Sequence, residues 1–289
     1  MIATHVATAK VDGIELYYER SGGRPSHGRP SHGRPSHGRT SGGRPPLLFL
    51  NGSGSTLATS SLLIEPFSAH FDVAAHDQRG LGRTSIPPGP YTMADYANDA
   101  AGLLDHLGWG RVRVVGISFG GMVAQELAVT WPERVERLAL LCTSPGGVGG
   151  SSYPLHELES LSLEDRQAVG LRLLDERFTP EYLEGDPAAK GLAEMMAARG
   201  LSPKTDEERR GEREQLGARR HHDVCDRLAA ITAPTLIAAG RYDGIAPIAN
   251  SEAIAARVPG SELRTYEGGH AFIGQDPKAL PDIITFLER

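Results

Sequence analysis

The chain has 289 residues and a formal net charge of −6, an acidic balance that argues against a nucleic-acid partner. Its two cysteines, Cys142 and Cys225, are too few for a disulfide framework, no stretch reaches the ~20 apolar residues of a membrane helix, and residues 1–11 lack the pattern of a signal peptide. We therefore expect a soluble, cytoplasmic protein with a small-molecule substrate and no membrane partner. The oligomeric state is not indicated.

The first predicted elements are two strands, at residues 6–11 and 14–19. Apolar and polar residues alternate in both, and between them stands Asp12-Gly13, a pair that favours the positive φ angles of a tight hairpin. The pattern predicts an antiparallel pair of strands at the start of the chain.

A repeat follows the hairpin. Residues 23–42 contain the pentapeptide GRPSH three times and end in a decayed copy, with no aliphatic side chain to offset the entropy of ordering the segment. We predict a disordered loop. Its three histidines have no acidic or cysteine ligand beside them, so we predict no metal site there.

From residue 47 onward, short apolar runs alternate with helical patterns, as is typical of a parallel sheet covered on both faces. The predicted strands are 47–50, 71–75, 112–115, 138–142, 235–239 and 262–266. The predicted helices between them are 60–69, 93–107, 120–131, 248–258 and 277–287. The fold class is therefore α/β.

One interval, 146–230, has no convincing strand. Charged amphipathic patterns at 161–178, 187–198 and 207–216 predict helices instead. We interpret 146–230 as a helical cap inserted into a core made of 1–145 and 231–289. Met195, Met196 and Leu201 fit the core of the cap better than a substrate pocket, and the basic run 219–222 is expected to be a solvent-exposed patch.

The strongest chemical signal is Gly116-Ile117-Ser118-Phe119-Gly120, which lies between a predicted strand and a predicted helix. A GxSxG sequence in this context is a nucleophile elbow, a turn so sharp that glycine must flank the serine on both sides. The helix that follows favours negative charge developing beside the hydroxyl. Ser118 is the predicted nucleophile.

A serine hydroxyl needs a general base, and the base needs an orienting acid. Asp243 follows strand 235–239 and His270 follows the last strand, so both fall at the carboxyl ends of strands, where open α/β sheets bind ligands. The order Ser118, Asp243, His270 is the order of this fold. Asp77 also follows a strand, but we interpret it as holding a loop.

The tetrahedral intermediate of acyl transfer needs two backbone donors for its oxyanion. Phe119, directly after the nucleophile, supplies one. The other is expected from Ser53 in the loop after the first central strand, with its neighbour Gly52 as the alternative.

The sequences LFLNGSGS, DQRGLGRTS, GISFGGMVAQELA, APTLIAAGRYDGIAP and EGGHAF resemble the α/β-hydrolase superfamily, in the branch of 3-oxoadipate enol-lactonases, cofactor-free haloperoxidases and small carboxylesterases. The resemblance covers nearly all of the chain from Leu47 and places nucleophile, acid, base and oxyanion amides at the residues named above. The family usually has His-Gly where this chain has Asn51-Gly52, and the GRPSH repeat has no counterpart.

These residues predict a serine hydrolase that cleaves a small carboxylic ester or lactone through an acyl-enzyme, with no cofactor and no metal. The serine at the elbow argues against haloalkane dehalogenases and epoxide hydrolases, which resemble this fold but carry aspartate there. Three alternatives use the same site: hydrolysis of a carbon–carbon bond, perhydrolase or lyase chemistry, and a non-catalytic receptor for a small ligand.

Overall fold

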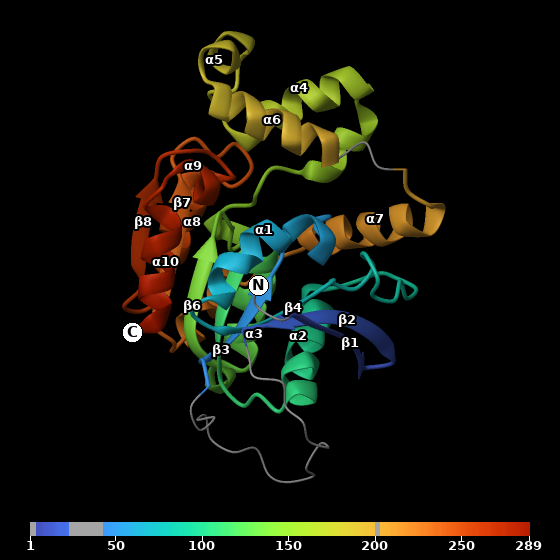
Figure 1. The fold of residues 1–289 in the computed structure, drawn as a ribbon, viewed down its shortest axis with the longest axis vertical. Helices are drawn as coiled ribbons and strands as arrows, with labels where there is room; N and C mark the ends of the chain where they lie inside the picture. Colours follow the sequence, from blue (N-terminus) through green and yellow to red (C-terminus); the bar gives the residue numbers. More distant parts are fainter. Residues whose placement is uncertain (1–3, 23–42, 200–202) are drawn as a thin grey trace.

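The computed structural model describes residues 4–22, 43–199 and 203–289. The predicted loop at 23–42 and Leu201 lie outside these residues. The described part of the chain forms an eight-stranded sheet with helices on both faces (Figure 1). In sheet order the strands are β1 (Thr4–Val11), β2 (Ile14–Ser21), β4 (Asp72–His76), β3 (Pro46–Leu50), β5 (Val112–Ile117), β6 (Val135–Leu141), β7 (Thr235–Gly240) and β8 (Glu262–Tyr266).

The hairpin of β1 and β2 is confirmed. Val11 pairs with Ile14 across the turn, and Asp12 and Gly13 have φ angles of 44° and 83°. β2 then pairs antiparallel with β4, and every later pairing is parallel. The predicted mostly parallel sheet is therefore confirmed, with its carboxyl ends gathered at one edge.

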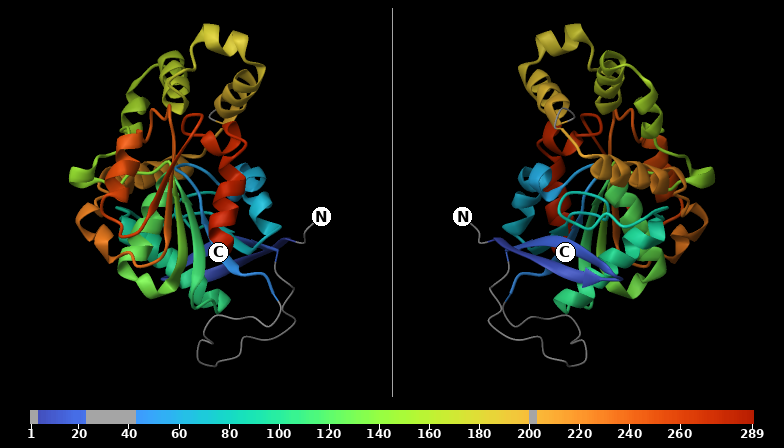
Figure 2. Two further views of the ribbon diagram at one scale, coloured as in Figure 1. Left: turned by 90° about the vertical axis from the view of Figure 1, so that its left-hand side faces the viewer. Right: turned by 90° about the vertical axis from the view of Figure 1, so that its right-hand side faces the viewer.

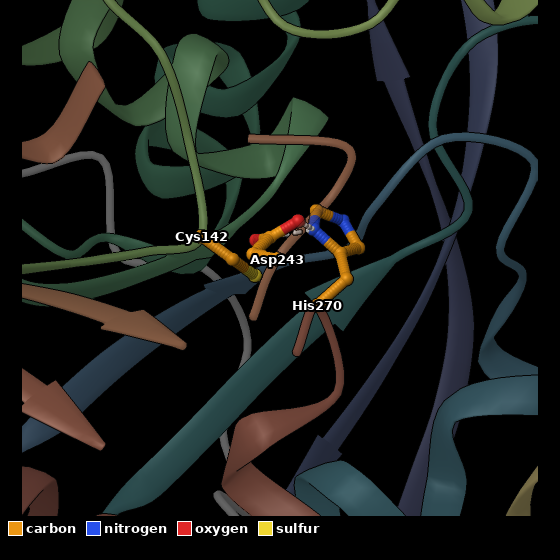
Figure 3. Close-up of side chains that lie close together, drawn as sticks. All are labelled: Cys142, Asp243 and His270. Atoms are coloured by element: carbon orange, nitrogen blue, oxygen red, sulfur yellow. Dashed lines mark hydrogen bonds and ion pairs between the residues drawn. The ribbon is translucent and has the colours of Figure 1, made fainter. Parts of the chain in front are cut away.

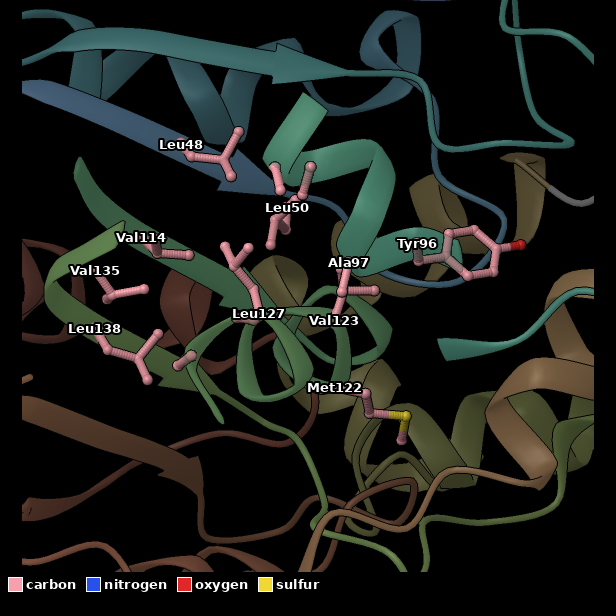
Figure 4. Close-up of a cluster of buried hydrophobic side chains, with 14 of the residues drawn as sticks. Leu48, Leu50, Tyr96, Ala97, Val114, Met122, Val123, Leu127, Val135 and Leu138 are labelled. Atoms are coloured by element: carbon pink, nitrogen blue, oxygen red, sulfur yellow. The ribbon is translucent and has the colours of Figure 1, made fainter. Parts of the chain in front are cut away.

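Both faces of the central strands are buried, as their nearly continuous apolar sequences predict. In β3, Leu48 and Leu50 point into one hydrophobic cluster and Leu47 and Phe49 into the other. The first cluster packs α2 (Met93–Leu107), α3 (Phe119–Thr130) and α8 (Ile248–Ala255) on the sheet, and part of it is drawn in Figure 4. The second packs α1 (Leu57–Ser68), α9 (Phe272–Gln275) and α10 (Ala279–Glu288).

Between β6 and β7 the described residues contain helices and no strand. The α-helices are α4 (Leu163–Leu174), α5 (Pro180–Gly185), α6 (Pro187–Arg199) and α7 (Asp206–Arg220). Figures 1 and 2 show α4, α5 and α6 together above the sheet, with α7 between them and the core. Leu174 and Phe178 form a small separate core with α6, and Met196 packs against it.

Several local predictions for this segment were wrong. The helix predicted to reach residue 178 ends at Leu174, because Asp175 leaves the helix in an extended conformation. α5 was not predicted, although Thr179 caps it and Pro180 begins it. Met195 is exposed rather than part of a core.

The basic run 219–222 is not the exposed patch that was predicted. Arg219 and His222 are buried, and only Arg220 and His221 are exposed. Arg219 donates to the Tyr153 carbonyl at 2.6 Å and to the Ser152 hydroxyl at 2.7 Å. Charge alone does not place an arginine at the surface, because its planar group can satisfy several buried acceptors at once.

Both cysteines are free and buried, as their apolar surroundings predict. Every helix in the part of the chain that the structure describes is too short or too polar to cross a lipid bilayer.

Candidate active site

Ser118 lies at the sharp turn between β5 and α3. Its φ and ψ of 54° and −115° are strained for a residue with a side chain. The flanking glycines are required sterically: a Cβ at Gly116 would collide with the backbone of Gly120, and a Cβ at Gly120 would collide with the carbonyl of Leu50. The turn is held by a 2.8 Å hydrogen bond from the Ser118 N–H to the Leu141 carbonyl.

The three predicted triad side chains are brought together. His270 Nε2 lies 2.9 Å from Ser118 Oγ, and His270 Nδ1 lies 2.9 and 2.8 Å from the two carboxylate oxygens of Asp243. Asp243 is buried and accepts two further hydrogen bonds of 2.8 Å from the backbone N–H groups of Ile245 and Ala246. These bonds fix the carboxylate, which in turn fixes the orientation of the imidazole.

The end of α4 fastens the loops that carry Asp243 and His270. The Leu174 carbonyl accepts from the His270 N–H at 2.6 Å, and the Leu173 carbonyl accepts from the Gly244 N–H at 3.1 Å. The Glu176 N–H donates to the Tyr242 carbonyl at 2.9 Å. A segment from the middle of the chain therefore bonds to both loops, beside the acid and beside the base.

Asp175 holds the segment after α4 in place through its side chain, and the sequence analysis did not single it out. Its fully buried carboxylate accepts from the backbone and guanidinium of Arg177 and from Gln275 Nε2 at 2.9 Å. Gln275 Oε1 accepts in turn from the Gly269 N–H, beside His270. Burial raises the pKa of Asp175, but the hydrogen bonds from Arg177 and Gln275 outweigh it and leave the pKa below its ordinary value.

The backbone amides predicted to face an oxyanion belong to two segments that meet at the serine. Phe119 is the first residue of α3, so its N–H has no acceptor within the helix. In the loop after β3, a Cβ placed on Gly52 would lie 3.6 Å from the Ser118 Cβ. The Gly54 N–H of this loop donates to Gln215 Oε1, so it is already engaged, whereas no hydrogen bond among the described residues uses the Ser53 N–H.

One group of three potential metal ligands occurs among the described residues, and it overlaps the triad. Ligand atoms of Cys142, Asp243 and His270 lie within 4.8 Å of one another (Figure 3). Burial and the neighbouring Asp243 raise the pKa of the Cys142 thiol well above its ordinary value, so the sulfur stays protonated. A neutral thiol leaves the Asp243 carboxylate to pair with His270 alone.

Asp77 holds a loop, as the sequence interpretation proposed. Its carboxylate accepts from the backbone N–H of Leu57 at 2.7 Å and from that of Arg83 at 2.9 Å. Arg79 of the same motif pairs with Asp99 instead, through hydrogen bonds of 2.6 and 2.7 Å. The motif therefore joins the start of α1 to α2 beneath the site.

Comparisons with known proteins agree with this fold. A family model described as alpha/beta hydrolase fold matches residues 45–277. A poly(3-hydroxyalkanoate) depolymerase of Ectopseudomonas oleovorans is 31% identical over 84% of each chain, and the 3-oxoadipate enol-lactonase 2 of Acinetobacter baylyi is 26% identical over 82% of this chain and 86% of that protein. A solved hydrolase from Pseudomonas aeruginosa PA01 matches 99% of both chains with a TM-score of 0.73 and 28% identity. The predicted fold and the resemblance to the enol-lactonase branch are confirmed.

Proposed function

This chain belongs to the alpha/beta hydrolase fold family, and we propose that it is a serine hydrolase that cleaves a small carboxylic ester or lactone. The observation that carries the proposal is the continuous hydrogen-bonded path from Ser118 Oγ through the His270 imidazole to Asp243. A hydroxyl, a base and an orienting acid in this geometry form an activated nucleophile.

In the proposed reaction Ser118 Oγ attacks the acyl carbon while His270 Nε2 takes its proton. Asp243 stabilises the imidazolium through Nδ1. The imidazolium then gives the proton to the departing alkoxide, which leaves as an alcohol. Water activated by His270 releases the acid and regenerates the free serine.

Negative charge develops on the former carbonyl oxygen during both steps. We assign its stabilisation to the backbone N–H groups of Phe119 and Ser53. The start of α3 adds a favourable dipole at the same place. These donors distinguish the transition state from the bound substrate, which is the requirement for catalysis.

The substrate class is supported by the relatives. A poly(3-hydroxyalkanoate) is a polyester and an enol-lactone is a cyclic ester, so both names describe cleavage of a carboxylic ester bond. We further propose that 146–230 acts as a cap, since the end of α4 lies directly on the loops of Asp243 and His270. The side chains of such a cap would set the size of the acyl and alcohol groups accepted.

The test is hydrolysis of p-nitrophenyl esters from acetate to decanoate, with lactone opening followed in parallel by release of acid. We expect turnover that is lost in Ser118→Ala. Ser251→Ala is the matched control, because Ser251 is a fully buried serine of α8 whose hydroxyl has no hydrogen-bond partner among the described residues.

Activity that survives in Ser118→Ala would refute the proposed nucleophile. A folded protein that turns over neither esters nor lactones would refute the proposed reaction and favour carbon–carbon hydrolysis, perhydrolase or lyase chemistry, or a ligand-binding role.

A further inference from the structure

Two buried glutamines connect α7 to the loop that follows β3. The Gly54 N–H donates to Gln215 Oε1 at 2.8 Å, Gln215 Nε2 donates to Gln78 Oε1 at 3.2 Å, and Gln78 Nε2 donates to the Asn51 carbonyl at 2.7 Å. Both glutamine residues are only 1% exposed. The two side chains therefore close a ring with the backbone of residues 51–54, from a helix about 160 residues further along the chain.

The direction of this ring is fixed by its backbone ends. A backbone N–H can only donate and a carbonyl can only accept, so Gly54 requires an acceptor from Gln215 and Asn51 requires a donor from Gln78. Only one orientation of each amide satisfies both ends and the bond between the two side chains. A carboxylate in place of either glutamine amide would lose its NH₂ donor, so two acceptor oxygens would then face each other in the ring.

The loop has little other support from its own side chains. Asn51 Nδ2 and Ser53 Oγ are buried with no hydrogen-bond partner among the described residues. Gly54 has a φ of 65°, and a Cβ there would meet nothing within 4 Å, so no packed side chain holds the turn. The glutamine ring is the main polar bracing of the residues that flank Ser53.

We infer that Gln215 of α7, with Gln78, is a positioning residue that holds the Ser53 N–H in place for the oxyanion. The inference rests on the proposed function. The ring bonds to Asn51 and Gly54, on the two sides of Ser53, and a Cβ placed on Gly52 would lie 3.6 Å from the Ser118 Cβ. α7 therefore contributes to the chemical step through its hydrogen bond to this loop.

The first variant is Gln215→Glu. The carboxylate still accepts from the Gly54 N–H but faces the Gln78 oxygen, so the ring opens. We expect kcat for p-nitrophenyl butyrate to fall about 10- to 100-fold, the range between a small misplacement and the loss of an oxyanion donor. KM should change by less than about threefold, because the Ser53 N–H bonds to the oxyanion only in the transition state.

A second measurement separates positioning from a general structural role. A trifluoromethyl ketone adds Ser118 to its carbonyl and places an oxyanion in the hole, so its inhibition constant should rise by the same factor as kcat/KM falls. The affinity for the product acid, which carries no tetrahedral oxyanion, should stay near the original value.

The rescue variant is Gln78→Lys in the Gln215→Glu background. The lysine ammonium donates to both the new carboxylate and the Asn51 carbonyl. Every link of the ring is then restored, with the hydrogen bond between residues 78 and 215 reversed in direction. We expect it to recover about tenfold of the lost kcat.

The control is Arg210→Met, which removes two hydrogen bonds from α7 to the Ile86 and Pro87 carbonyls. It loosens α7 without touching the loop, so kcat should stay within about twofold. Should Gln215→Glu fail to fold, Gln215→Asn, whose shorter amide cannot reach both partners, takes its place with the same expected result.

Loss of activity in Ser118→Ala together with an unchanged kcat in Gln215→Glu would overturn this inference and leave the proposed function standing. An equal fall of kcat in Arg210→Met would also overturn it, since the effect would then belong to the attachment of α7 in general. Full activity in Ser118→Ala would instead refute the proposed function itself.

Discussion

Replacing Asp175 with asparagine should destabilise the protein by about 2–3 kcal/mol. In the carboxylate, Oδ1 accepts from the backbone N–H and Nε of Arg177, and Oδ2 accepts from Arg177 Nη2 and Gln275 Nε2. Whichever way an asparagine amide is turned, its NH₂ group faces two donors. Two hydrogen bonds are lost, each contributing about 1.5–3 kcal/mol when a charged group takes part.

The expected value lies at or just below the lower end of that sum because water can compensate part of the loss. The Arg177 side chain is 27% exposed and keeps its position 4.0 Å from the centre of the Tyr242 ring. The assay is urea unfolding followed by circular dichroism near neutral pH. Asp206→Asn is the control, since this exposed carboxylate also pairs with an arginine, and its loss should leave the unfolding midpoint unchanged.

The difference between wild type and Asp175→Asn should also depend on pH. The folded protein holds the pKa of Asp175 below the ordinary 3.8, so its carboxylate stabilises the fold above that value. The stabilisation is lost as the pH falls through the lowered pKa. An unfolding midpoint that is equal in the two proteins near neutral pH would refute the reasoning, because the buried pair would then only offset its own desolvation.

Three further outcomes are expected. Gly120→Ala should lower the free energy of unfolding by about 3 kcal/mol or more in a urea titration, because its methyl group collides with the carbonyl at the end of β3, whereas Gly274→Ala has open space and should not. Arg79→Lys should lower it by about 1–2 kcal/mol, since lysine cannot make both hydrogen bonds to Asp99. Replacing 23–42 with a short glycine-serine linker should leave kcat and KM for p-nitrophenyl esters unchanged. The following strand β3 begins at the amino ends of the parallel strands, whereas Ser118 lies at their carboxyl ends.

The sequence predicted what is encoded locally. The elbow at Ser118 could be found because a strand, two obligatory glycines and a helix are adjacent in the chain. Asp243 and His270 could be placed because each follows an apolar strand, and parallel strands bring their carboxyl ends together. The strand positions came from the same apolar runs, with errors of up to three residues at their ends. β6 begins at Val135, three residues before the predicted start, because Glu136 and Arg137 interrupt the apolar run inside the strand.

Residues that act through distant partners could not be predicted in this way. Asp175 sits within a charged helical pattern, and its role appears only when Gln275, 100 residues later, is folded against it. Gln78 lies inside a recognisable motif, but its partner Gln215 carries no local signal. A polar side chain between helical neighbours looks the same whether it faces water or a buried acceptor.

The buried face of α7 shows why hydrophobic periodicity fails here. Its buried residues are Gly211, Gln215, Ala218 and Arg219, which have the helical spacing of a core-facing stripe but almost no apolar surface. Gly211 allows the helix to approach the backbone of Gly80 closely, and one and two turns further along, the side chains of Gln215 and Arg219 donate to Gln78 and to the Tyr153 carbonyl. Periodicity methods detect burial through apolar side chains, so they assign this face to solvent. A helix attached by hydrogen bonds rather than apolar contacts can fix the orientation of a loop, because each bond has a direction that a hydrophobic contact lacks.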